Sequence, residues 1–223
     1  MTPDVKVCGV RDPGFAAAAA GLGVDYVGVI FASASPRCVT VETARAIAAA
    51  ARRVPRAAPP RVVGVFVEQS EQEVLQMAAS VPLDVVQLHG GRSVEAAAAA
   101  RRRGLEVWRL VAADNAPDAT DADALLLDGS RGGRSGGTGC CADWSRVAEL
   151  KRQGRRVVLA GGLSAANIRQ AAATGADILD VNSSLETAVG EKSVPLLEAL
   201  MCALRGVSAR ERTGGRGPLH FCD

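Results

Sequence analysis

The sequence has few aromatic residues and almost no excess charge of either sign. Aromatic side chains make up 3% of the 223 residues, and 26 basic residues face 24 acidic ones, for a formal net charge of +2. This near balance gives no reason to expect a nucleic-acid partner. The hydrophobic fraction of 48% excludes a disordered chain, and the length favours one large domain over two.

Long hydrophobic runs and paired cysteines are also missing. No apolar run approaches the ~20 residues that cross a bilayer, and the N-terminus lacks the basic and apolar regions of a signal peptide. We therefore expect a cytoplasmic protein with no membrane partner. The six cysteines form no CxxC pair, which argues against a bound metal, and the cytoplasm should keep them reduced.

Two short clusters of arginine stand where helices are expected to end. They comprise Arg101–Arg103 and Arg152 with Arg155–Arg156. Cations there complement the helix dipole, so we interpret both clusters as helix-end charges rather than as a binding patch.

The chain alternates short apolar runs with longer alanine-rich segments. Continuous apolar runs suit strands that are buried on both faces of a parallel sheet. The expected strands are Val5–Val10, Asp25–Phe31, Arg61–Val67, Asp84–His89, Glu106–Val111, Ala124–Asp128, Val157–Ala160 and Ile178–Val181. The expected helices are Pro13–Ala20, Val41–Val54, Glu71–Ser80, Ser93–Arg103, Trp144–Gln153, Ala165–Thr174 and Val194–Arg205.

Local signals support these helices. Candidate N-caps are Thr40, Ser70, Ser93, Asp143, Ser164 and Ser193, and glycines that fit just past helix ends are Gly104, Gly154 and Gly175. The connection from Ala112 to Asp123 is polar and predicts little or no helix.

Eight strand–helix units predict a single (β/α)₈ barrel of the α/β class. A doubly wound sheet is the weaker alternative, since no Gly-x-Gly-x-x-Gly follows the first strand. We expect the barrel domain to span residues 1–206 and a polar tail to span 207–223. The active site of such a barrel lies at the carboxyl ends of its strands.

The ends of the last two strands favour a phosphate. Gly161-Gly162 leads into the expected Ala165–Thr174 helix, and Ser183-Ser184 follows the final strand. Loops at these places form the common phosphate site of barrels, where backbone N–H groups hold the anion. The alternative is that the glycines only form a tight turn. No lysine or arginine is obvious there, so N–H groups and dipoles would carry the binding.

A thiol and a carboxyl group lie at two other strand ends. Cys8 lies at the end of the first strand, and Asp128 ends the apolar run of the sixth. A lone cysteine is commonly a small core residue, but a buried carboxylate needs a partner or a function. Facing one mouth, the two form a plausible base and acid.

Four further residues are candidates for substrate contacts. Arg37, in a loop stiffened by Pro36, has the fork that binds carboxylates, although it is equally compatible with a plain surface role. His89 is either an acid–base group or a structural histidine beside Gly90. We also expect Gln87 and Asp180, at the ends of the fourth and eighth strands, to contact substrate.

Taken in order, these motifs resemble one family, phosphoribosylanthranilate isomerase of tryptophan biosynthesis. The resemblance extends to about residue 205. It is carried by Lys6-Val7-Cys8-Gly9-Val10, Ser35-Pro36-Arg37, Val63-Gly64-Val65-Phe66-Val67, Val86-Gln87-Leu88-His89-Gly90, Leu126-Leu127-Asp128, Gly136-Gly137-Thr138-Gly139 with Asp143-Trp144, Leu159-Ala160-Gly161-Gly162-Leu163 and Asp180-Val181-Asn182-Ser183.

The resemblance implies an Amadori rearrangement of a small phosphosugar, with no cofactor and no metal. Cys8 then matches the family's general base and Asp128 its general acid. Arg37 matches the arginine that faces the anthranilate carboxylate, and Gly161, Gly162 and Ser183 match the phosphate loops, beside Ser184. We expect a monomer or a weak homodimer.

Four residues depart from the family's usual pattern: Cys38, Glu68, Asn182 and Ser184, the last in place of a glycine. The aromatics on relevant strands are only Tyr26, Phe31 and Phe66, so Arg37 and aliphatic walls would carry much of the anthranilate binding. The alternatives are a paralogous phosphosugar isomerase acting on a related substrate and a non-catalytic barrel that binds a phosphosugar or a protein. A histidine-pathway type of isomerase would have an aspartate in place of Cys8.

Overall fold

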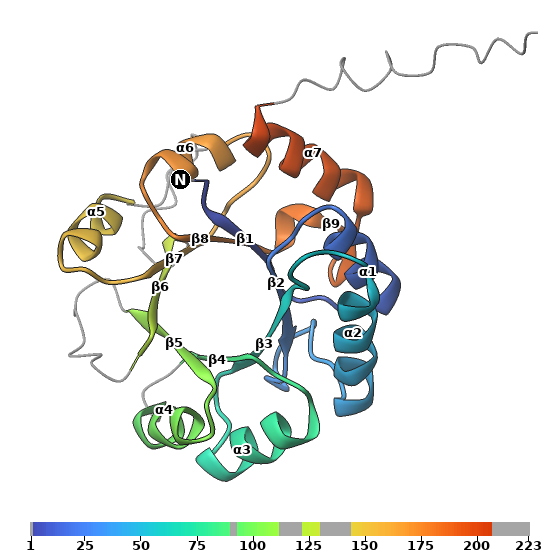
Figure 1. Ribbon diagram of the computed structural model, residues 1–223, viewed down its shortest axis with the longest axis vertical. Helices are drawn as coiled ribbons and strands as arrows, with labels where there is room; N and C mark the ends of the chain where they lie inside the picture. The colour runs from blue at the N-terminus through green and yellow to red at the C-terminus, as the bar shows by residue number, and fades with distance from the viewer. Residues whose placement is uncertain (1, 90–92, 112–121, 130–143, 207–223) are drawn as a thin grey trace, which may run out of the picture.

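The computed structural model describes residues 2–89, 93–111, 122–129 and 144–206. Eight parallel strands close into one barrel in chain order, β1 to β8 (Figure 1). They are β1 (Asp4–Val7), β2 (Tyr26–Ile30), β3 (Arg61–Phe66), β4 (Val85–Leu88), β5 (Glu106–Val111), β6 (Ala124–Asp128), β7 (Val157–Ala160) and β8 (Ile178–Val181). The predicted barrel is confirmed, and the doubly wound alternative is wrong.

Helices surround the ring on its outside (Figure 1). They are α1 (Pro13–Gly21), α2 (Val41–Arg53), α3 (Glu71–Ser80), α4 (Ser93–Arg102), α5 (Ser145–Arg152), α6 (Ile168–Ala173) and α7 (Val194–Arg205). A short antiparallel pair, β9 (Glu186–Ala188) and β10 (Glu191–Lys192), follows β8. The loops 112–121 and 130–143, with the glycine-rich motif 136–139, and the expected tail 207–223 lie outside the described residues.

The predicted helix ends are largely confirmed. Side chains of Thr40, Ser70 and Ser193 cap α2, α3 and α7, and Gly104, Gly154 and Gly175 follow helices with positive φ. The expected cap at Ser164 is wrong, because α6 begins only at Ile168. The backbone N–H of Ser164 instead donates to the side chain of Asn167, which holds the chain in a turn before the helix.

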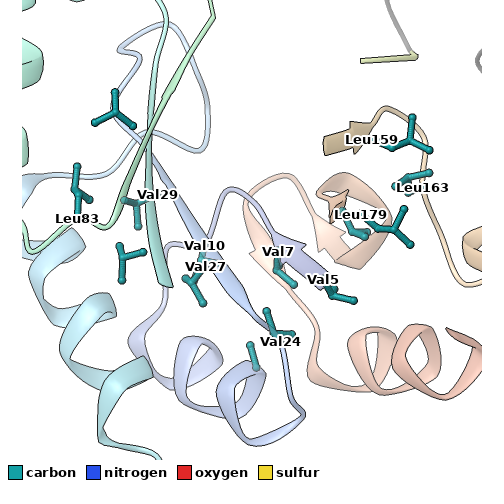
Figure 2. Close-up of a cluster of buried hydrophobic side chains, with 14 of the residues drawn as sticks. Val5, Val7, Val10, Val24, Val27, Val29, Leu83, Leu159, Leu163 and Leu179 are labelled. Atoms are coloured by element: carbon teal, nitrogen blue, oxygen red, sulfur yellow. The ribbon is translucent and has the colours of Figure 1, made fainter. Parts of the chain in front are cut away.

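The core has two parts because side chains of a strand alternate between the two faces of the barrel wall. Outward-facing residues pack under the helices. Figure 2 shows part of this shell, with Val5, Val7, Val27, Val29, Leu159 and Leu179 from neighbouring strands. Inward-facing residues form a separate cluster inside the barrel, which includes Cys8, Tyr26, Trp108 and Leu126.

The amino end of the barrel is closed by an ionic layer. Asp4, Arg61, Glu106 and Arg156 come from the starts of the odd-numbered strands, as expected for one layer of barrel side chains. Glu106 pairs with Arg61 and, at 2.7 Å, with Arg156, which also lies 3.8 Å from Asp4. Our interpretation of Arg156 as a helix-end charge is therefore wrong.

Four aspartates add a repeated clamp at the same end. Each stands directly before an even-numbered strand and accepts a hydrogen bond from a backbone N–H of the preceding odd-numbered strand. The pairs are Asp25 with Val5 (2.9 Å), Asp84 with Val62 (2.7 Å), Asp123 with Val107 (2.8 Å) and Asp177 with Val157 (2.7 Å). Each aspartate also pairs with a cation: Arg56, Arg52, Arg101 and Lys151, in the same order.

Candidate active site

A cavity of about 340 Å³ opens at the carboxyl ends of the strands. Its aliphatic walls include Ile30, Val65, Leu126 and Leu163. Eight of the residues singled out from the sequence line it together: Cys8, Gln87, His89, Asp128, Gly161, Gly162, Asp180 and Ser183. Arg37 and Ser184 are not among its lining residues.

Cys8 follows β1 and projects into the barrel, where its side chain is buried. Burial raises the pKa of the Cys8 thiol, because a thiolate loses its hydration there. The ammonium of Lys6, two residues earlier on the same face, opposes this and favours the thiolate. The protonation state of Cys8 thus depends on a balance between burial and a neighbouring charge.

Lys6 is fully buried, and its Nζ donates to Oδ2 of Asp180 at 2.6 Å. Burial on its own would lower the pKa of Lys6, but the attraction of Asp180 raises it overall. Burial likewise raises the pKa of Asp180, against the pull of Lys6. The second carboxylate oxygen of Asp180, Oδ1, is buried and has no hydrogen-bond partner among the residues that the structure describes.

Asp128 is the last residue of β6 and lines the same cavity, partly exposed to it. Two strands, β7 and β8, lie between β6 and β1 around the ring. The thiol and this carboxyl group therefore face one cavity from different sides.

Gln87 and His89 project from β4 into the cavity. Gln87 Nε2 lies 2.5 Å from His89 Nε2, so the two side chains hold each other. Gln87 Oε1 is buried and has no hydrogen-bond partner within the described part of the chain. A buried acceptor without a partner costs stability, which makes this amide and Asp180 Oδ1 natural contacts for a bound ligand.

Arg37 binds Glu186 with both arms of its fork: Nε donates to Oε1 at 2.7 Å and Nη2 to Oε2 at 2.6 Å. The hydrogen bond from Arg37 holds the pKa of Glu186 at about 2, well below its ordinary value. Lys192, from β10, is almost completely buried and donates to Glu186 and to Asn182, each at 2.7 Å. Burial lowers the pKa of Lys192.

The loops after β7 and β8 meet beside the cavity. Gly161 and Gly162 have φ values of 90° and 68°, a region that residues with a side chain rarely adopt. The sequence analysis placed a helix directly after these glycines, but α6 begins six residues after Gly162. Ser184 lies in the 3₁₀ turn Ser183–Leu185, and its hydroxyl donates to the carbonyl of Leu163, joining the two loops.

Of the other departures from the family pattern, Asn182 lines the cavity, whereas Glu68 and Cys38 do not. Glu68 accepts hydrogen bonds from the backbone and the hydroxyl of Ser33. Tyr26 lies at the amino end of the barrel, 5.0 Å from the ring of Trp108, and Phe31 stacks on Phe66 in the outer shell. The cavity walls are accordingly aliphatic.

Sequence analysis assigned no role to Lys6, Glu186 or Lys192. Lys6 lies within a quoted motif, where a charge among otherwise apolar residues was its signal, whereas Glu186 lies three residues beyond the last quoted motif. Lys192 lies far along the chain in a hairpin that no periodicity indicated. Among the described residues, no three His, Cys, Asp or Glu side chains cluster as metal ligands, and no helix of those stretches is long and apolar enough to span a membrane.

A closed eight-stranded parallel barrel with a thiol and a carboxyl group in one mouth defines the class, a (β/α)₈-barrel enzyme. The family model of N-(5'-phosphoribosyl)anthranilate isomerase matches residues 5–202. The chain belongs to this family.

Relatives and solved structures agree. The isomerase of Desulforamulus reducens is 39% identical over 92% of this chain and 96% of its own. The crystal structure from Thermus thermophilus is 34% identical, covers 91% of this chain and 98% of its own, and has a TM-score of 0.77. A third structure, 28% identical with a TM-score of 0.75 over 92% of this chain and all of its own, is a complex with reduced 1-(o-carboxyphenylamino)-1-deoxyribulose 5-phosphate.

Proposed function

We propose that the chain converts N-(5-phosphoribosyl)anthranilate into 1-(o-carboxyphenylamino)-1-deoxyribulose 5-phosphate, the isomerase step of tryptophan biosynthesis. The observation that carries the assignment of roles is that Cys8 and Asp128 line one cavity from different strands. The comparisons favour neither a paralogous phosphosugar isomerase nor a non-catalytic barrel.

Asp128 acts as the general acid. It gives a proton to the ribose ring oxygen, the C1′–O bond breaks, and the sugar opens to a Schiff base with the anthranilate nitrogen. Its position at the cavity, partly exposed, allows contact with the ring oxygen of a bound substrate.

Cys8 acts as the general base, as its thiolate. It removes the proton from C2′, and the electron pair moves to form an enolamine, which becomes the ketone as C1′ takes up a proton. The overall step is an isomerisation, so atoms and electrons balance without an oxidant or a reductant.

Polar groups around these two residues orient the substrate. We assign contacts with sugar hydroxyl groups to Gln87, His89 and Asp180, because Gln87 Oε1 and Asp180 Oδ1 are buried without partners. We assign the anthranilate carboxylate to Arg37. Glu186 occupies its Nε and Nη2, so Nη1 is the arm that faces away from Glu186.

We assign the phosphate to the loops of Gly161, Gly162, Ser183 and Ser184. The support is the positive φ of both glycines and their place on the cavity wall with Ser183. The hydroxyl of Ser184 is used by Leu163, so its part in binding is to fix the loop backbone whose N–H groups hold the anion. Lys192, beside Asn182, adds a positive charge at this edge.

The test follows the fluorescence of freshly made phosphoribosylanthranilate, which is lost on turnover. We expect Cys8→Ser and Asp128→Asn each to lower kcat by about 100-fold or more while the circular dichroism spectrum stays unchanged. Cys202→Ser, which changes a free cysteine on α7, is the matched control and should keep full activity. Near-normal turnover in Cys8→Ser or Asp128→Asn would remove that residue from its role.

We further propose that the enzyme works in the reducing cytoplasm, as a monomer or a weak homodimer, with residues 1–206 as its catalytic domain. A base at Cys8 must stay a free thiol, as it is here. Sedimentation at micromolar concentration tests the oligomeric state, and a stable higher oligomer would contradict the proposal.

A further inference from the structure

The deepest polar group of the site belongs to Lys6. Its side chain has no exposed surface, and it extends inside the barrel beside Asp180, its register partner on β8. Burying an ammonium costs several kcal/mol unless it is paired, which the 2.6 Å contact with Asp180 provides. A buried charge pair of this kind contributes little to stability compared with apolar residues of the same volume. Its position below Cys8 therefore calls for a functional explanation.

Gly28, on the neighbouring strand β2, makes room for this arrangement. A Cβ at position 28 would lie 3.1 Å from Lys6 Cε, 3.1 Å from Cys8 Cα and 3.2 Å from Cys8 Sγ. The backbone of β2 thus approaches both side chains closely. An alanine there would push Lys6 and Cys8 away from their observed positions.

We infer that Lys6, held by Asp180, is a positioning residue that sets the charge on the Cys8 sulfur. The inference rests on the proposed role of Cys8 as the base. The ammonium donates to the carboxylate of Asp180, while the Lys6 side chain and the Cys8 sulfur both lie against the backbone of Gly28, so the same charge acts on the sulfur. Any contact that draws Asp180 toward a bound ligand leaves more of the ammonium's charge to stabilise the thiolate.

Other charged groups also act on the Cys8 sulfur, and the contribution of Lys6 must be distinguished from theirs. Lys192 from β10 and Arg37 from the loop after β2 also interact with Cys8 electrostatically, but both are held by Glu186. Asp180 from β8 acts in the opposite sense and disfavours the thiolate. Lys6 is the cation that shares a strand face with Cys8, and its charge is the one that most favours the thiolate.

The test measures the thiolate directly and needs no substrate. The intact protein is treated with iodoacetamide at pH values from 6 to 10, and the modified Cys8 peptide is quantified by mass spectrometry, so that other cysteines do not contribute. Because only the thiolate reacts, the rate reports the pKa of Cys8. We expect Lys6→Met to slow the reaction at pH 7 by about tenfold or more, which corresponds to one pKa unit or more.

Asp180→Asn provides the opposite and sharper result. It removes the charge that disfavours the thiolate and keeps the size of the side chain, so the reaction of Cys8 should become severalfold faster. A merely structural role for the pair predicts changes in the same direction in both variants. Equal rates in wild type and Asp180→Asn, or slower reaction in Asp180→Asn, would overturn the inference even if Lys6→Met does not fold.

Two controls separate charge from packing and the inference from the proposed function. Lys151→Met removes a lysine paired with Asp177 at the other end of the barrel and should leave the Cys8 rate unchanged. Gly28→Ala should shift the rate while the net charge is constant. If Cys8→Ser retains turnover, the proposed base is wrong, whereas the alkylation rates still decide whether Lys6 sets the charge on Cys8.

Discussion

The two ends of the barrel differ in whether their buried polar groups have hydrogen-bond partners. At the amino end, Glu106 contacts two arginines and the indole of Trp108, and four aspartates each bind a backbone N–H and a cation. At the carboxyl end, Gln87 and Asp180 each have a buried side-chain oxygen that accepts no hydrogen bond from any described residue. The hydrogen-bonding capacity of the buried polar groups is therefore used up at the amino end, the saturated end, and partly unused at the carboxyl end, the unsaturated end.

The difference separates stability from binding. Polar groups at the amino end already have partners, so they have little capacity left to bind a ligand. Removing one of them would leave its partners without a hydrogen bond or a counter-charge, which lowers stability. The buried oxygens of Gln87 and Asp180 at the carboxyl end lower stability, and they can accept hydrogen bonds from a ligand. Substitutions at the two ends should therefore affect different quantities.

The largest effect is expected from Glu106→Ala. It leaves Arg61 and Arg156 without their shared carboxylate and Trp108 Nε1 without its acceptor. We expect the free energy of unfolding to fall by about 2–4 kcal/mol, measured by urea denaturation, mostly because the buried Trp108 N–H loses its acceptor and partly because two half-exposed arginines lose their partner. The kcat/KM per folded molecule should remain within about twofold, and a selective loss of kcat/KM would break the separation of the two ends.

A smaller loss is expected at one clamp. Asp84→Ala removes the acceptor of the Val62 N–H and the partner of Arg52, so unfolding should become easier by about 1–3 kcal/mol. Asp84→Asn, which keeps one acceptor oxygen, should recover part of the loss. Equal Tm values for the alanine variant and wild type would show that the clamp contributes nothing.

Gln87→Leu should have the opposite pattern of effects, keeping stability while lowering activity. It replaces a buried amide oxygen without a partner by an apolar side chain of similar size, so stability should hold or rise by about 1 kcal/mol. Turnover should fall by about tenfold or more, because the ligand loses its contact and His89 loses its neighbour. Unchanged activity would remove Gln87 from the binding site.

The smallest effect concerns the pH dependence of Glu186→Gln. Glu186 has a pKa of about 2 in the folded protein against an ordinary value of 4.5, so the folded state holds the proton less tightly than the unfolded one. Its charge therefore stabilises the fold above pH 4.5, and this contribution is lost as the pH falls toward 2. The Tm difference between wild type and Glu186→Gln should shrink across that window. A constant difference would contradict the assignment.

The saturated end was the harder one to predict from the sequence. The strands were evident because β-branched and leucine runs recur between alanine-rich segments. Arg156, however, was placed at a helix end, because its neighbours Arg152 and Arg155 suggested a helix-end cluster. Its side chain points toward Glu106 because of the register of β7, which the sequence does not reveal. The four clamp aspartates precede apolar runs and carry no local signal of their pairing.

The unsaturated end was predicted in outline. Strand ends in a barrel converge, so the sequence predicted that Cys8, Asp128, Gln87, His89 and Asp180 meet in one mouth, and in the structure all five line one cavity. Lys192 and the late start of α6 were missed. Both depend on the path of the chain through irregular turns, which no periodicity describes.

The clamps also divide the barrel into four pairs of strands. Every one joins an odd-numbered strand to the even-numbered strand that follows it: β1 to β2, β3 to β4, β5 to β6 and β7 to β8. The amino end thus repeats one two-strand module four times, although the sequence shows no obvious repeat beyond an aspartate before each even strand. Chain breaks placed between modules, as in a circular permutation or an exchange of half-barrels between relatives, leave each aspartate and the backbone N–H that it binds within one continuous segment.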